Sequence, residues 1–104
     1  MEKVIRDGHV AVLYSPGYGA GWFTWNENHK ELLFHPKIVE MVEQNRNSEI
    51  NEDWVKDNLG IANAYTGGAE DLRIEWIPQG TRFIINEYDG SESIHIYDNN
   101  SLVA

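Results

Sequence analysis

The sequence predicts an α+β fold, in which two or three short helices pack on one face of an antiparallel sheet of four or five strands. Three observations predict it. An apolar run typical of a strand opens the chain, helix signals follow it, and the last third alternates between apolar and polar residues with turns in between. The expected sheet combines the N-terminal strand with a C-terminal β-meander. A chain of 104 residues is expected to fold as a single domain, residues 1–104.

The first strand is expected at residues 9–14, where β-branched and aromatic residues dominate and polar residues stand only at the ends. Such a run is typical of a strand that is covered on both faces. Asp7 and Gly8 before it are a turn signal, so residues 3–6 could pair with this strand in a hairpin. The pattern leaves open whether the strand joins the centre or the edge of the sheet.

Three short helices are expected between residues 24 and 59. The first would run through residues 27–33. Pro36 suits the first turn of the second helix, and an apolar stripe follows it. Asn51 is a good N-cap for the third helix, and Gly60 fits the position after its last turn.

Three further strands are expected at residues 72–77, 81–88 and 93–98. The first of them alternates cleanly between apolar and polar residues, which is typical of a strand with one buried face. The Asp-Gly dipeptide between the last two strands is a strong hairpin signal. Residues 101–104 are expected to fray, because chain ends are poorly ordered unless something ties them down.

The densest cluster of glycine and aromatic residues lies at residues 15–26, directly after the first strand. Glycine is required where the backbone takes a positive φ or where another group comes close to it. The backbone N–H groups of such a loop can hold an anion, and aromatic rings beside it can stack on a nucleotide base. The candidate ligand-binding residues of this loop are Ser15, Gly17, Tyr18, Gly19, Gly21, Trp22 and Trp25.

A structural role is the alternative for this loop. The spacing of its three glycines, at 17, 19 and 21, matches neither the dinucleotide-binding fingerprint nor the Walker A loop. The glycines could instead make a tight connection between a strand and a helix, in which Trp22 and Trp25 fold back onto the core. The sequence supports both interpretations.

Two further pairs of residues could complete an anion site. Gly67 and Gly68 form a predicted turn that could approach the glycine-rich loop and line one pocket with it. Arg73 and Arg82 lie on neighbouring predicted strands and could hold an anion together. The alternative for the two arginines is cross-strand pairing with glutamates of those strands.

The net charge of −9 restricts the partners. A protein that binds the backbone of duplex nucleic acid needs a basic stripe, and the eight lysine and arginine residues here are scattered. Duplex nucleic acid and membranes are therefore not expected as partners. An acidic surface could serve solubility or attract a basic protein. The lack of cysteine, of a signal-peptide pattern and of a bilayer-length apolar run is compatible with the cytoplasmic location that we expect.

No catalytic or metal-binding motif stands out, so we expect binding rather than catalysis, with no cofactor and no metal. The four histidines lack the H-x-x-x-H and H-E-x-x-H spacings of zinc sites. The seventeen Asp and Glu residues include close pairs, and two carboxylates held several ångströms apart can hydrolyse a glycoside. A carboxylate-based hydrolase is therefore a weaker alternative.

Three segments together resemble a family of small proteins from bacteriophages and prophages: SPGYGAGW at residues 15–22, YTGGAEDL at 65–72 and EYDGSESI at 87–94. The resemblance covers most of the chain. It implies a phage genome as the source and the host cytoplasm as the location. The family has no assigned function, so the resemblance implies no site residues.

Two functions fit these observations. The first is a non-enzymatic protein that binds a small anionic or nucleotide ligand through the glycine-rich loop and could sequester a nucleotide signal of host defence. Such a protein is expected to be a homo-oligomer, because symmetric assembly creates clefts between subunits. The second is an acidic inhibitor of a host nucleic-acid-handling or defence complex. The loop favours the first.

Overall fold

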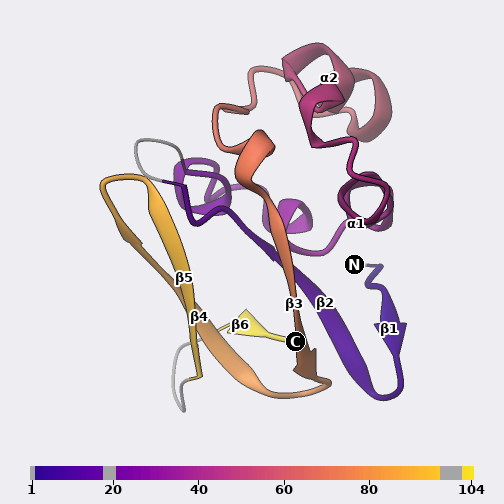
Figure 1. Cartoon of the computed structure of the whole chain (residues 1–104), viewed down its shortest axis with the longest axis vertical. Helices are drawn as coiled ribbons and strands as arrows, with labels where there is room; N and C mark the ends of the chain where they lie inside the picture. The colour runs from indigo at the N-terminus through magenta and orange to yellow at the C-terminus, as the bar shows by residue number, and fades with distance from the viewer. Residues whose placement is uncertain (1, 18–20, 97–101) are drawn as a thin grey trace.

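The computed structural model describes residues 2–17, 21–96 and 102–104. In these residues the chain forms two antiparallel three-stranded sheets, two α-helices and short 3-10 turns (Figure 1). The predicted α+β class is confirmed. The strands divide between two sheets, in place of the one sheet of four or five strands that the sequence predicts.

The first sheet contains β1 (Ile5–Arg6), β2 (His9–Tyr14) and β3 (Arg73–Pro78), in the order β1-β2-β3. Residues 10–13 of β2 are fully buried, so the predicted strand with two covered faces is confirmed. Its place at the centre of this sheet is a point that the sequence left open. A two-residue turn joins β1 to β2, as the Asp-Gly signal predicts.

The second sheet contains β4 (Arg82–Tyr88), β5 (Ser91–Ile96) and β6 (Leu102–Val103), in the order β5-β4-β6. The predicted Asp-Gly hairpin between β4 and β5 is confirmed. The predicted meander is interrupted, since β3 pairs with β2 and not with β4. Pro78, which has no N–H to donate to a ladder, is the last residue of β3, and the turn after it carries the chain into the second sheet.

Leu102 and Val103 pair with β4, in contrast to the fraying that the sequence predicts for residues 101–104. Ser101 lies outside the described residues. Leu102 lies opposite Phe83 and packs in a hydrophobic cluster with it. Ala104 is buried. Its carbonyl accepts from the N–H of Gly80 at 2.7 Å, and its own N–H donates to the carbonyl of Thr81 at 2.9 Å. These hydrogen bonds hold Ala104 in place, and because their partners are distant in the sequence, a local pattern cannot predict them.

Two of the three predicted helices are confirmed as α1 (Pro36–Glu43) and α2 (Glu52–Leu59). The side chain of Asn51 accepts from the N–H of Trp54 at 2.8 Å, as expected of an N-cap. Gly60 ends α2 in the left-handed region, at φ 74°, where a side chain would be strained.

The first predicted helix, residues 27–33, is replaced by two 3-10 turns, η1 (Phe23–Trp25) and η2 (Lys30–Leu33). An amphipathic α-helix needs apolar residues three or four positions apart. Here Leu32 and Leu33 are adjacent and both fully buried, and they belong to different hydrophobic clusters. The tighter turn lets both side chains reach their own cluster.

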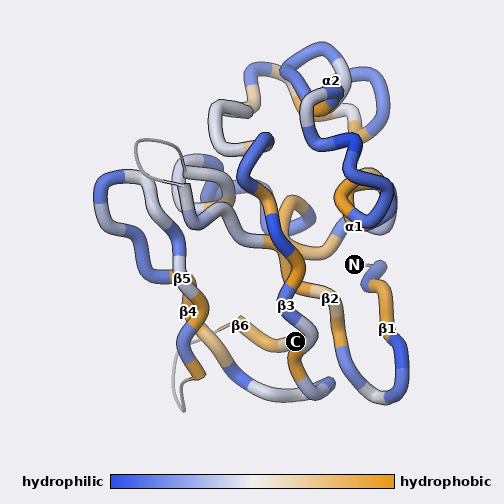
Figure 2. Tube along the Cα trace, in the orientation of Figure 1, coloured by the Kyte–Doolittle hydropathy of each residue, from blue (hydrophilic) through white to orange (hydrophobic). Residues whose placement is uncertain are grey.

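The two hydrophobic clusters lie on opposite sides of β2. Ala11 and Leu13 belong to the cluster that includes α1 and α2, whereas Val10 and Val12 belong to the cluster that includes the second sheet. Successive side chains of a strand point to opposite faces, so one strand serves both clusters. Figure 2 shows hydrophobic residues along β2 and hydrophilic residues over most of α2. The end of β2 delivers Ser15 to the candidate site.

His35 caps the N-terminus of α1 and makes stability depend on pH. Its Nδ1 accepts from the N–H of Lys37 at 3.1 Å. Burial, and to a smaller extent the charge of Lys37, lowers the pKa of His35. The unfolded chain, in which this pKa is about 6.5, therefore binds a proton more readily. The stabilisation from the neutral cap is complete above about pH 6.5 and is lost as the pH falls through the lowered pKa.

The variant His35→Asn keeps a capping side chain that does not titrate. Between about pH 8 and about pH 5, we expect the urea midpoint of the wild-type protein to fall further than that of the variant. The difference between the two proteins isolates His35 from the other titrating groups. Equal losses would show that this histidine contributes nothing to the pH dependence.

Candidate functional site

The backbone N–H groups at the two ends of the glycine-rich loop bind a carboxylate of the protein itself, the side chain of Glu92. Glu92 of β5 is 1% exposed. Its Oε1 accepts from the N–H of Ser15 at 2.9 Å. Its Oε2 accepts from the N–H of Trp22 at 3.0 Å, from the N–H of Thr24 at 2.9 Å and from the Oγ1 hydroxyl of Thr24 at 2.7 Å. Hydrogen bonds to a carboxylate are stronger than neutral ones, so Glu92 holds the two ends of the loop together.

The position of Glu92 follows from the way β5 starts. The Asp-Gly hairpin ends just before it, and the N–H of Glu92 donates to the carbonyl of Ser15 at 2.8 Å. The Ser91 hydroxyl donates to the carbonyl of Pro16 at 2.6 Å. These two bonds fix the start of β5 beside the loop. The side chain of Glu92 therefore lies among the N–H groups of Ser15, Trp22 and Thr24. Sequence reasoning missed Glu92 because it treated this residue as part of the hairpin turn.

Of the two glycines in the predicted turn, Gly68 lies against the glycine-rich loop, and this contact explains why position 68 is a glycine. A Cβ on Gly67 would instead meet the ring of Tyr65. The Ser15 hydroxyl donates to the carbonyl of Gly68 at 2.8 Å. A Cβ on Gly68 would come closer than 3.0 Å to the carbonyl oxygen of Gly21, a distance that real Cβ atoms do not show. Neither Gly67 nor Gly68 has a positive φ. Close approach of two backbones is therefore what requires glycine at 68.

The two tryptophans of the loop have different surroundings. Trp22 is fully buried, and its indole N–H donates to the carbonyl of Leu32 at 2.9 Å. It packs in the core, as the structural alternative expects, and has no ring face left for a ligand. Trp25 is 43% exposed and lies over Gly21. Its ring centroid is 4.6 Å from that of Tyr65, at an angle of 48°.

The side chain of Asn26 holds the backbone of the two segments that carry this aromatic pair. Its Nδ2 donates to the carbonyls of Trp22 and Tyr65 at 2.7 and 2.9 Å, and its Oδ1 accepts from the N–H of Tyr65 at 2.9 Å. Tyr65 and Asn26 are not among the predicted ligand-binding residues, since their contact spans 39 positions. The candidates Tyr18 and Gly19 lie outside the described residues.

The two candidate arginines do not share a sheet, so the expectation that they lie on neighbouring strands is wrong. Arg73 begins β3 and lies opposite Tyr14, whereas Arg82 begins β4 and lies opposite Val103. The cross-strand partner of Arg73 is therefore Tyr14 and not a glutamate. Arg73 is at the start of β3, whereas Arg82 follows the turn at the end of β3, so the length of that strand separates them.

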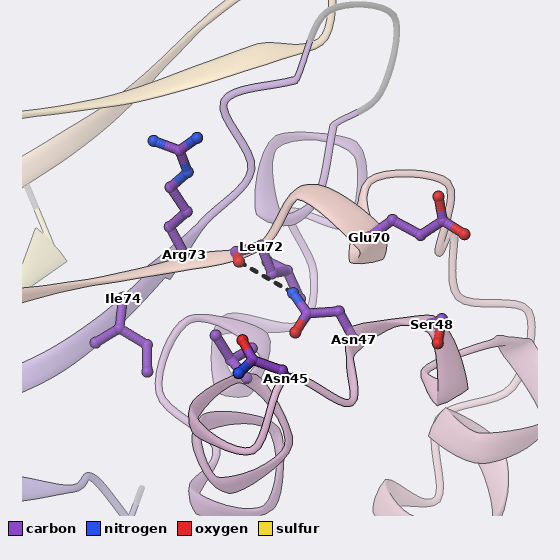
Figure 3. A pocket seen from close by; sticks show the side chains of 8 residues that line it. Asn45, Asn47, Ser48, Glu70, Leu72, Arg73 and Ile74 are labelled. Atoms are coloured by element: carbon purple, nitrogen blue, oxygen red, sulfur yellow. Dashed lines mark hydrogen bonds between the residues drawn. The ribbon is translucent and has the colours of Figure 1, made fainter.

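Arg73 lies at a surface groove of about 570 Å³ between the end of α1 and the start of β3 (Figure 3). The side chain of Asn47 forms one wall, donating to the carbonyls of Ala69 and Leu72 at 3.2 and 3.1 Å. The guanidinium of Arg73 points away from Asn45 and Asn47. The groove therefore offers amides and a hydroxyl above an aliphatic floor. Its lining residues are Val42, Asn45, Asn47, Ser48, Glu70, Leu72, Arg73 and Ile74.

Comparison with protein-family models, with curated proteins and with solved structures finds no match to this chain. The resemblance to phage proteins stays a prediction. Within the described residues, no three His, Asp or Glu side chains are grouped so that they could hold a metal ion. In the same part of the chain, neither α-helix has the length and apolar character that crossing a membrane requires.

Proposed function

We propose that the protein is a non-enzymatic binding protein that takes a small ligand with a planar ring and an anionic group, of the nucleotide class, at the face of residues 15–26. The observation that carries this proposal is the ring pair of Trp25, which is 43% exposed, and Tyr65, which is partly buried. Aromatic rings accept any planar π-system, and stacking a base on one is worth about 1–3 kcal/mol.

The support beneath the pair makes it suitable for binding. Asn26 fixes the backbone on both sides of it, and Gly21 lets the Trp25 ring lie directly on the loop. A ring that is already held in place loses little conformational entropy when a ligand stacks on it. The N–H groups around Glu92 are engaged, so the proposal places the ligand on the aromatic pair and not inside the loop.

The resemblance to phage proteins extends this proposal to a biological setting. In a host cytoplasm, a protein that binds a nucleotide without converting it could remove a signal of host defence. The net charge of −9 keeps an acidic inhibitor of a basic host complex as the alternative. Binding of a nucleotide would favour the first proposal over the second.

Calorimetric titration with the four ribonucleoside monophosphates, ribose 5-phosphate and inorganic phosphate tests the proposal. We expect a monophosphate to bind and Trp25→Ala to weaken it by about 10- to 100-fold, the loss of one stacking ring. Ile96→Ala is the control, since Ile96 is 61% exposed and pairs with Phe83 at the end of the hairpin away from the loop face, so it should leave affinity unchanged. Equal affinity of the wild type and Trp25→Ala, or no binding of any monophosphate, would contradict the proposal.

A further inference from the structure

The outer edge of β3 carries backbone groups that the first sheet does not use. The N–H of Ala11 donates to the carbonyl of Val4, on the β1 side of β2, and the N–H of Gln79 donates to the carbonyl of Gly8. Alternate residues of an antiparallel ladder direct these groups to opposite sides. In the observed register, the N–H and C=O groups of Arg73, Glu75 and Ile77 therefore face β2. Those of Ile74 and Trp76 face outward.

This open edge is short and has defined ends. β3 is the last strand in the order β1-β2-β3 (Figure 1), and the outward groups of Ile74 and Trp76 have no backbone partner among the described residues. At one end, the carbonyl of Leu72 accepts from Asn47. At the other end, Pro78 has no N–H. An open edge is a template for pairing with another strand, and here it is limited to two residues.

We propose that a second copy of this chain pairs with this edge, strand β3 against strand β3 in antiparallel orientation, about a two-fold axis at Ile74. This inference goes beyond the proposed ligand site and does not depend on it. Ile74 of each copy would exchange two backbone hydrogen bonds with Ile74 of the other. Arg73 of each copy would then lie opposite Glu75 of the other, on the face of β3 that also carries Ile77.

Charge selects this register. Arg73 and Glu75 are both exposed and stand two positions apart on one face of β3. When two copies of β3 pair with each other, Arg73 of one copy faces Glu75 of the other only if the two-fold axis passes through Ile74, the residue between them. An axis at Glu75 would set two carboxylates against each other, and an axis at Trp76 would set Glu75 opposite Ile77. Like charges directly opposite destabilise a strand pair, whereas opposite charges stabilise it.

The groove beside the edge fits the same arrangement. Leu72 and Ile74 line it, and they share the helix-side face of β3 with Trp76, which packs half-buried against the same cluster. With the axis at Ile74, Trp76 of the second copy lies opposite Leu72. Leu72 and Ile74 of the groove would therefore lie along the joined edge. The net charge of −9 on each copy opposes association, but at about 0.15 M salt such repulsion is screened beyond about 8 Å.

Sedimentation equilibrium of four proteins tests the proposal: wild type, Arg73→Glu, Glu75→Arg, and the double variant that exchanges the two charges. Both side chains are exposed, so all four should fold. We expect a wild-type dimer, about tenfold weaker association in each single variant, and recovery to within about threefold of wild type in the double variant.

Recovery in the double variant is specific to this register, because only there do the two exchanged positions face each other. A wild-type protein that stays monomeric at about 1 mM would overturn the proposal and leave the edge to a strand from another protein. A dimer that Arg73→Glu and Glu75→Arg leave unchanged would overturn it too, as would a double variant as weak as the single ones.

Discussion

Replacement of Glu92 by alanine is expected to destabilise the protein by about 3–5 kcal/mol. The change leaves the N–H groups of Ser15, Trp22 and Thr24 and a hydroxyl without their acceptor. Each unsatisfied buried donor costs about 1–3 kcal/mol, and water can reach only the part-buried Thr24 with ease. Because small domains are stable by about 5–15 kcal/mol, the loss is a large part of the total. Urea unfolding followed by tryptophan fluorescence measures it.

Two further variants separate the hydrogen bonds of Glu92 from the effect of losing any glutamate. Glu92→Gln keeps one acceptor oxygen but turns an NH₂ group toward N–H donors, so we expect most of the loss to remain. Glu87→Ala is the matched control in the same hairpin, because Glu87 is exposed and accepts one hydrogen bond, from Gly90. It should cost about 1 kcal/mol or less. Similar losses in Glu92→Ala and Glu87→Ala would show that the buried carboxylate does not organise the loop.

Gly68→Ala is expected to cost at least about 3 kcal/mol, and Gly17→Ala less than about 1 kcal/mol. In both variants the new Cβ would come closer than 3.0 Å to another atom. At Gly68 this atom is the backbone carbonyl oxygen of Gly21, which two packed segments hold in place. At Gly17 it is the carboxyl group of Asp71, an exposed side chain that can rotate away.

The same measurement of unfolding compares the two alanine variants, which differ by one methyl group from the wild type at each site. A large loss in both would mean that Asp71 is as firmly fixed as the backbone at Gly21. A small loss in both would contradict the close packing of the Gly68 turn against the loop. Only the unequal result fits two backbones in contact at one site and a movable side chain at the other.

The parts of the fold that the sequence predicts are those with local causes. Asn51 and Gly60 delimit α2 through their own backbone and side-chain preferences. The Asp-Gly dipeptides set both hairpins in the same way. The pairing of β3 with β2 has no local cause, because it joins Tyr14 to Arg73 across the whole helical region. Alternation along β3 shows that one face is buried but not which strand lies beside it.

The candidate site shows the same division. Glycine and aromatic composition identifies the loop, and the Gly67-Gly68 turn signal suggests that Gly68 could approach it. The role of Glu92 could not be predicted, since its acceptor oxygens meet N–H groups up to 77 positions away. A glutamate in a strand is normally a solvent-exposed residue, and only the long-range fold makes this one buried. The anion-binding character of the loop was thus visible, but its occupant was not.

The most direct test of the central proposal, that the paired rings of Trp25 and Tyr65 hold a nucleotide-like ligand, is a native mass spectrum of the protein purified from cells. Wild type and Trp25→Ala would be prepared in parallel, and any released small molecule identified after denaturation. The proposal predicts a stoichiometric nucleotide-like mass on the wild type that is absent from, or much reduced on, the variant. A bare wild-type protein, or the same mass on both, would contradict it.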